Sequence, residues 1–411
     1  MNSDLGFTES GDTVVSMTDS FSKSLATGFK HFQKVPAQPC FHIMTICCLL
    51  ATLWGCATTQ TRSRVHSGPA GVQKISMPGT VIRMTPDPII LEKVYDAPRL
   101  FHLAGEAERR KESALAIVLY KKLIEEFDNV DYQQVSLFNL GMLHEDKEKW
   151  AEAIGYYEQV IKLYDGMPID EDQLYFDTFM RLGVCFAKLE RWWDAVYAFE
   201  NLVSLEWIDE QDRMEIQLGK GITFEGAGET TLAESAYSRV LSLYRRLQRG
   251  IGGDRTMAAE AAFRLGEMTR KKYEAVELSY PIELLRERLE TKCGFLLTAQ
   301  NRYLRSIRFG DGHTMAAAGY RLGDLYEDLY QTIVSFEPPE ELSEDQIELY
   351  DEEVRRKVIV LLKKAIRIYE KSLKLGKRLQ SSESWLIQLE RALSRMKTLY
   401  LEEEAAFKDP L

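Results

Sequence analysis

Apolar residues recur at intervals of three and four along much of this chain, which is the spacing of α-helices that bury one face. Leu137 and Leu140 belong to one such stripe, and Leu389, Leu393 and Met396 belong to another near the C-terminus. We find no convincing segment in which apolar and polar residues alternate as they do in a half-buried strand. The pattern therefore predicts an all-α fold.

A triplet of residues repeats along the first half of this pattern. A small residue is followed twelve positions later by alanine and four positions after that by an aromatic residue. The four copies are Ala104, Ala116 and Tyr120; Gly141, Ala153 and Tyr157; Gly183, Ala195 and Phe199; and Gly221, Ala233 and Tyr237. Small residues let two helices approach closely, and the aromatic ring fills the space beside the contact. Each triplet therefore predicts a pair of antiparallel helices.

The triplet resembles the tetratricopeptide repeat, in which helix A carries the small residue and helix B carries the alanine and the aromatic residue. In the fourth unit Lys220 stands where leucine is usual, so we expect its helix A to shift and to use Gly219. The resemblance implies an α-solenoid that binds protein partners.

Two longer units follow the regular ones. Residues 256–266 nearly repeat as residues 314–323, and each segment predicts a helix A whose helix B comes late. Breaks are expected at Pro281 and at residues 337–341, because proline interrupts a helix. Residues 383–407 predict one more amphipathic helix that covers the end of the stack. We therefore expect about six antiparallel helix pairs, the last two with lengthened helices, and a C-terminal capping helix.

The N-terminal region contains residues 41–55, which carry no charge and follow Lys30 and Lys34. This run is shorter than the roughly 20 residues of a membrane-spanning helix and suits the core of a signal peptide. It ends in Leu53-Trp-Gly-Cys56, which resembles the bacterial lipobox and implies lipidation of Cys56. The alternatives are a short membrane-anchoring helix or a buried apolar segment.

The lipobox resemblance extends to localisation. Ala57 stands where a retention signal for the inner membrane usually has aspartate, which implies an outer-membrane lipoprotein facing the periplasm. We expect four segments along the chain. They are an N-terminal extension with the signal peptide (1–55), a flexible tether (56–88), regular repeat units (89–250), and extended-helix units with the capping helix (251–411).

Charge and composition exclude several classes of function. The chain has 52 basic and 63 acidic residues and a formal charge of −11, which argues against binding along a nucleic acid. The six histidines are scattered, and no phosphate loop, nucleophile elbow or zinc spacing is present. We expect no enzyme activity, no metal and no cofactor.

The remaining candidate site is the groove lined by helix A. The position three residues before the small residue is apolar in every unit. Its occupants are Phe101, Phe138, Met180, Leu218, Phe263 and Tyr320. Glu145 and Glu327 stand four residues after the small residue and flank this stripe. These residues suit a peptide or helix with apolar and basic side chains. The alternative is that the apolar residues only pack between neighbouring helices.

We therefore expect a membrane-anchored periplasmic scaffold or adaptor in a cell-envelope assembly such as motility, pilus or secretion machinery. The long-helix units are similar to those of tetratricopeptide lipoproteins of the myxobacterial lineage, some of them linked to gliding. One alternative is a pilotin-like or chaperone-like carrier of envelope or secreted subunits. Another is an accessory activator of a peptidoglycan enzyme.

Overall fold

The computed structural model describes residues 96–166, 172–247, 254–340 and 342–407. These residues form thirteen α-helices and contain no strand, which confirms the all-α prediction. The helices are α2 (Ala97–Arg109), α3 (Ser113–Glu126), α4 (Val130–Glu145), α5 (Trp150–Leu163), α6 (Gln173–Lys188), α7 (Trp192–Val203), α8 (Glu210–Gly226), α9 (Thr230–Leu247), α10 (Arg255–Glu274), α11 (Ile282–Phe309), α12 (Gly312–Val334), α13 (Glu344–Arg378) and α14 (Glu383–Ala406).

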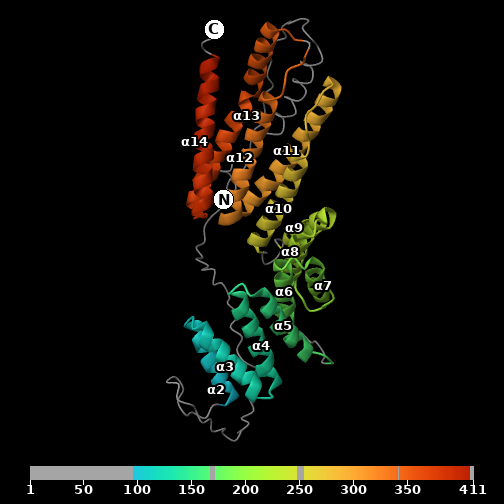
Figure 1. The fold of residues 1–411 in the computed structure, drawn as a ribbon, viewed down its shortest axis with the longest axis vertical. Coiled ribbons are helices and arrows are strands. Elements are labelled where there is room, and N and C mark those ends of the chain that lie inside the picture. Colours follow the sequence, from blue (N-terminus) through green and yellow to red (C-terminus); the bar gives the residue numbers. More distant parts are fainter. Residues whose placement is uncertain (1–95, 167–171, 248–253, 341, 408–411) are drawn as a thin grey trace, which may run out of the picture.

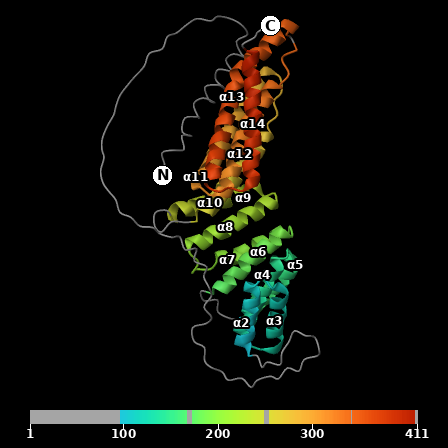
Figure 2. The ribbon, with the colours of Figure 1, turned by 90° about the vertical axis from the view of Figure 1, so that its left-hand side faces the viewer.

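Successive helices pack as the six expected antiparallel pairs, from α2 with α3 to α12 with α13. The final helix, α14, packs on α13 and α12 and covers the end of the stack. Figures 1 and 2 show an elongated molecule with α2 and α3 at one end and α12, α13 and α14 at the other. The predicted solenoid with a C-terminal cap is confirmed.

Each helix A starts at the same kind of cap. An aspartate or asparagine side chain accepts a hydrogen bond from a backbone N–H in the first turn, which satisfies a donor that the helix itself leaves without a partner. The capping residues are Asp96, Asn129, Asp172, Asp209, Asp254 and Asp311. The sequence thus marks the start of every unit with a polar side chain.

Small residues and aromatic rings meet as the triplet predicts. A Cβ added at Gly141 would lie 2.3 Å from Cε1 of Tyr157, so only glycine fits at this contact. The equivalent pairs are Gly183 with Phe199, Gly221 with Tyr237, Gly266 with Tyr303, and Gly323 with Tyr369. The pairing of Gly221 with Tyr237 shows that the fourth unit keeps its register, so the expected shift to Gly219 is wrong.

The last two pairs have lengthened helices, as predicted. Their helices contain 20, 28, 23 and 35 residues, against 12 to 18 in the first four pairs. Helix α11 begins directly after Pro281, and α13 begins at a capping box formed by Ser343 and Gln346. Both breaks fall where proline interrupts the sequence.

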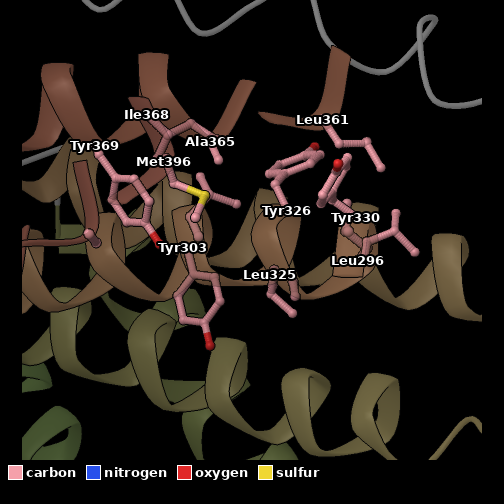
Figure 3. Packing of buried hydrophobic residues seen from close by; sticks show 14 of the residues in the cluster. Leu296, Tyr303, Leu325, Tyr326, Tyr330, Leu361, Ala365, Ile368, Tyr369 and Met396 are labelled. Atoms are coloured by element: carbon pink, nitrogen blue, oxygen red, sulfur yellow. The ribbon is translucent and has the colours of Figure 1, made fainter. Parts of the chain in front are cut away.

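The largest hydrophobic cluster lies between α10 and α14. Figure 3 shows its tyrosines at 303, 326, 330 and 369 packed among aliphatic side chains. Helix α14 supplies Leu389, Ala392 and Met396, each at most 1% exposed. These side chains bury the surface that the last pair would otherwise expose.

Cys56 and the segments 1–55 and 56–88 lie outside the described residues, so their predicted roles stay predictions. Within the helices that the structure describes, none has the length and apolarity needed to cross a bilayer.

Candidate partner-binding groove

The apolar residues predicted to line the groove lie over the aromatic rings of helix B. The ring centroids of Phe138 and Tyr157 are 5.6 Å apart, and those of Phe263 and Tyr303 are 5.9 Å apart. Phe101 lies in the same way on Tyr120. Each predicted aromatic anchor therefore belongs partly to the core of its own unit.

Their exposure differs from one unit to the next. Phe138 is 9% exposed and Met180 is 8% exposed, so neither side chain lies open in the groove. Phe101, Phe263 and Tyr320 are half-buried. The ring on helix B packs against the small residue of helix A. The same ring also contacts the helix A side chain three residues before that small residue, and this contact buries the helix A side chain. The role of these five residues in partner binding stays a prediction.

The two predicted carboxylates are engaged inside the stack. Glu145 accepts a 2.5 Å bond from Nη1 of Arg181, and its second oxygen lies 3.0 Å from the thiol of Cys185. Glu327 accepts two bonds, of 2.9 and 2.8 Å, from the guanidinium of Arg395. Each carboxylate is paired with an arginine of a later helix. These ion pairs therefore link neighbouring units of the stack.

A related arrangement that adds a tyrosine recurs at most interfaces between units, and we call it the interrepeat relay. At the Glu145 interface the hydroxyl of Tyr157 is buried without a hydrogen-bond partner among the described residues, so only the ion pair is formed there. A helix B tyrosine donates to a helix A carboxylate, which also lies close to a polar side chain on the next helix A. In the fourth unit, Tyr237 donates to Glu225 at 2.8 Å and Arg264 donates to the same oxygen at 3.1 Å. Burial, together with the nearby Glu225 carboxylate, raises the pKa of Tyr237 above its usual 10, so the hydroxyl keeps its proton.

Other units build the relay with small changes. In the first unit Tyr120 donates to Glu108, and the next helix contributes Asn139. In the fifth unit Tyr303 donates to Glu267, and Arg321 lies 3.4 Å from the same carboxylate. The sequence signal for this relay is an arginine or asparagine two residues before the small residue of the next unit.

The third interface lacks the relay. Phe199 replaces the tyrosine, Ala187 replaces the carboxylate and Gly219 replaces the arginine. The Phe199 ring lies between two glycines, because a Cβ added at Gly183 or Gly219 would be 2.5 or 2.6 Å from its Cζ atom. All three polar groups are therefore absent together, and an apolar contact takes their place.

This exchange leaves an uncharged area between α6 and α8, which we call the apolar window: Val184, Ala187, Gly219 and Ile222. Val184 is 44% exposed, and the other three residues are half-buried. On the neighbouring interfaces the same position is occupied by the Glu145–Arg181 and Glu225–Arg264 pairs. The window is thus an apolar gap in a row of ion pairs.

Acidic side chains border the window. Asp177 and Glu215 stand seven residues before Val184 and Ile222, which places each on the same face of its helix two turns away. Desolvation raises the pKa of Glu215, and repulsion from Asp212, Asp177 and Asp254 raises it further. Negative charge therefore accumulates beside the window.

In the described ranges, no group of three or more histidine, cysteine, aspartate or glutamate side chains is placed to hold a metal ion. Cys185 and Cys293 are buried free thiols. Burial raises the pKa of the Cys293 thiol to about 12, so it stays protonated at neutral pH.

Comparisons with known proteins agree with this class of fold. Residues 136–170, which include the later part of α4 and all of α5, match the tetratricopeptide repeat family. Proteins with this repeat are generally interaction scaffolds that bind peptide or protein partners. No curated protein sequence matches the chain.

Several solved structures are similar in part. MamA from Desulfovibrio magneticus RS-1 is 14% identical over 50% of this chain and 94% of its own, with a TM-score of 0.35. YrrB, described as a tetratricopeptide repeat protein with an unusual peptide-binding site, is 19% identical over 52% of this chain and 91% of its own, with a TM-score of 0.34. A tetratricopeptide repeat protein from Parabacteroides merdae is 12% identical over 71% of this chain and 98% of its own, with a TM-score of 0.35.

Proposed function

We propose that this protein is a non-enzymatic scaffold that holds a protein partner at the apolar window. The observation that carries the proposal is the coordinated loss of all three relay groups at one interface, where Val184 is left 44% exposed. The interfaces on both sides of the window carry ion pairs, and the window is the uncharged gap between them. A partner that inserts a charge into this gap would lose the hydration of that charge, so the gap favours an apolar side chain.

The expected partner is a peptide or helix with an apolar side chain that covers Val184 and Ile222. Basic residues beside that side chain would meet Asp177 and Glu215. The apolar contact supplies most of the affinity, and the charges act mainly on the rate of association and on specificity.

A charge placed in the window tests this proposal. Val184→Lys should weaken partner binding with little loss of thermal stability, because the side chain is already partly in water. The matched control is Val118→Lys on α3, where the wild-type side chain is 55% exposed. Equal affinity of the wild type and the Val184→Lys variant for the same partner would rule out the window as the binding site.

We further propose that the scaffold is a lipoprotein anchored at Cys56, facing the periplasm from the outer membrane and serving an envelope assembly. The support is the uncharged run of residues 41–55 followed by the lipobox-like Leu53-Trp-Gly-Cys56. Cys56→Ala should remain unprocessed and incorporate no labelled fatty acid. Wild-type labelling of that variant would show that the anchor lies elsewhere or does not exist.

A further inference from the structure

A basic surface lies where the ends of α9 and α11 meet. The ring of Tyr244 on α9 packs edge-on against the ring of Phe309 on α11, with their centroids 5.0 Å apart. Three arginines stand within four residues of these rings in the sequence, and we call them the arginine cluster: Arg245, Arg305 and Arg308. Neither helix lines the apolar window, so the cluster is a separate feature of the molecule.

The two sequence segments that carry the cluster contain no acidic residue. Residues 235–253 include four arginines, and residues 291–310 include three arginines and one lysine. In a chain with a formal charge of −11, these segments are a local reversal of sign. The helix dipole favours basic residues in the last turn, which accounts for Arg245 and Arg308. It does not account for Arg305, which stands one turn before the end of α11.

Arg305 is half-buried beside a like charge. Burial lowers the pKa of Arg305 below its usual 12.5, and the positive charge of Arg245 lowers it further. The ion pairs of these two segments are formed by Arg246 and Arg302, whereas no carboxylate in the described part of the chain lies within ion-pair distance of Arg305 or Arg308. A partly desolvated charge without a counterion is unfavourable, and an anion bound to both guanidinium groups would compensate it.

Acidic side chains do occur at the starts of α8, α10 and α12, which adjoin the ends of α9 and α11. Four of them cap the first turns of these helices, and one pairs with Arg246. They are Asp209, Asp212, Asp254 and Asp311 at the caps, and Glu210 in the pair. Arg245 donates to the carbonyl oxygen of Leu241 in its own helix, at 3.3 Å. The arginine cluster therefore keeps its positive charge.

We propose that the arginine cluster binds a phosphate group. A phosphate monoester carries a charge of about −1.5 to −2 at neutral pH and three acceptor oxygens, so it can accept hydrogen bonds from more than one guanidinium group. A single carboxylate has one charge and two oxygens, which would leave the second arginine uncompensated. A longer polyanion, such as an acidic peptide, would extend toward the carboxylates at the helix starts and be repelled by them. The free ion and the headgroup of a lipid offer the same phosphate chemistry.

Calorimetric titration of the full chain with inorganic phosphate tests the site, against chloride at matched ionic strength. Arg305→Gln should weaken phosphate binding by about tenfold or more, because it removes one of the two adjacent charges. The matched control is Arg239→Gln, which changes an exposed arginine six residues before Arg245, on another side of α9. This control should leave the affinity within about twofold of the unsubstituted chain.

Thermal unfolding separates binding from a structural role of the same arginine. In buffer without phosphate, Arg305→Gln should melt at the same temperature as the unsubstituted chain or higher, because it removes a partly desolvated charge that has no counterion. Added phosphate should raise the melting temperature of the unsubstituted chain more than that of the variant. A lower melting temperature of Arg305→Gln without phosphate would show that the arginine stabilises the fold, and would contradict the proposal.

Vesicles distinguish the source of the phosphate. Flotation with phosphatidylcholine vesicles that contain phosphatidic acid, and that bind the unsubstituted chain but not Arg305→Gln, would identify a lipid headgroup as the ligand. Titration of inorganic phosphate with the same dependence on Arg305, without vesicle binding, would identify a soluble phosphate. The proposal is overturned if neither the vesicles nor phosphate at about 10 mM bind, or if Arg239→Gln and Arg305→Gln weaken binding equally. Binding of an acidic peptide in place of phosphate would also overturn it.

Discussion

At the scale of single residues, the units are held together by glycines that touch aromatic rings. Phe199 is in the tightest position, because it meets Gly183 in its own unit and Gly219 in the next. Tyrosine at that position would need an acceptor that Ala187 does not supply. One phenylalanine with two glycines therefore replaces a polar contact by close packing, and this exchange creates the apolar window.

The close packing predicts the effect of adding one carbon atom. Gly219→Ala should reduce the free energy of unfolding by about 1 to 3 kcal/mol, because the new Cβ overlaps the Phe199 ring. Gly155→Ala is the matched control, since a Cβ there meets no atom within 4 Å, and it should be neutral or stabilising by about 0.5 to 1 kcal/mol. Chemical denaturation measures both. Equal effects of the two substitutions would contradict the assigned contact.

His144 gives the stability of the first units a dependence on pH. Its ring lies edge-on to Tyr156 at 5.0 Å, and its Nδ1 is buried with no hydrogen-bond partner among the described residues. Burial, aided by the nearby Lys149, Lys147 and Lys121, lowers the pKa of His144 below its usual 6.5, against the opposing effect of Glu152. The unfolded chain therefore binds a proton first as pH falls.

The stabilising contribution of neutral His144 is present above about pH 6.5 and is lost as pH falls from there toward the lower folded-state pKa. His144→Phe keeps a ring against Tyr156 but has no titrating group. The stability of the wild type relative to this variant should therefore decrease between about pH 7.5 and pH 5.5, measured by denaturation at each pH. A constant difference would show that His144 titrates alike in both states.

At the scale of helices, α14 packs on the last pair in the way that the helix A of a following unit would. Arg395 meets Glu327 as Arg264 meets Glu225 two interfaces earlier. At its other end, Glu403 accepts hydrogen bonds from Tyr330 and Arg355. The cap therefore joins both α12 and α13 with polar contacts as well as apolar ones.

Weakening the cap should loosen only the nearest units, since each unit in a solenoid contacts its neighbours alone. Met396→Ala should cost about 2 to 5 kcal/mol, because Met396 is 1% exposed and leaves a cavity. Hydrogen exchange should rise in α12 and α13 and stay unchanged in α2 to α5. A uniform increase along the whole chain would show instead that the stack unfolds as one cooperative unit.

The helix pairs were predictable because small residues, alanines and rings recur at fixed spacing, and because proline marks the breaks before α11 and α13. The burial of Phe138 and the pairing of Glu145 with Arg181 were not. Both depend on the offset between neighbouring helices, which spacing within one unit does not define. The loss of the relay was visible in the sequence only as three separate substitutions, at Ala187, Phe199 and Gly219.

At the scale of the whole molecule, two differently built parts share one stack. The short pairs include the apolar window, and the long helices form the opposite end of the molecule (Figure 2). The proposed partner site therefore belongs to the short pairs alone.

If the window between α6 and α8 holds the partner, a photoreactive group placed in the window will crosslink to that partner. This is the most direct test of the proposed site. A photoreactive phenylalanine analogue replaces Val184 in one chain and Val118 in another, and both chains are expressed in the native cell envelope. We expect one discrete adduct from position 184, lost when Asp177 and Glu215 are changed to lysine, and no such adduct from position 118. The same adducts from both positions, or none from position 184, would contradict it.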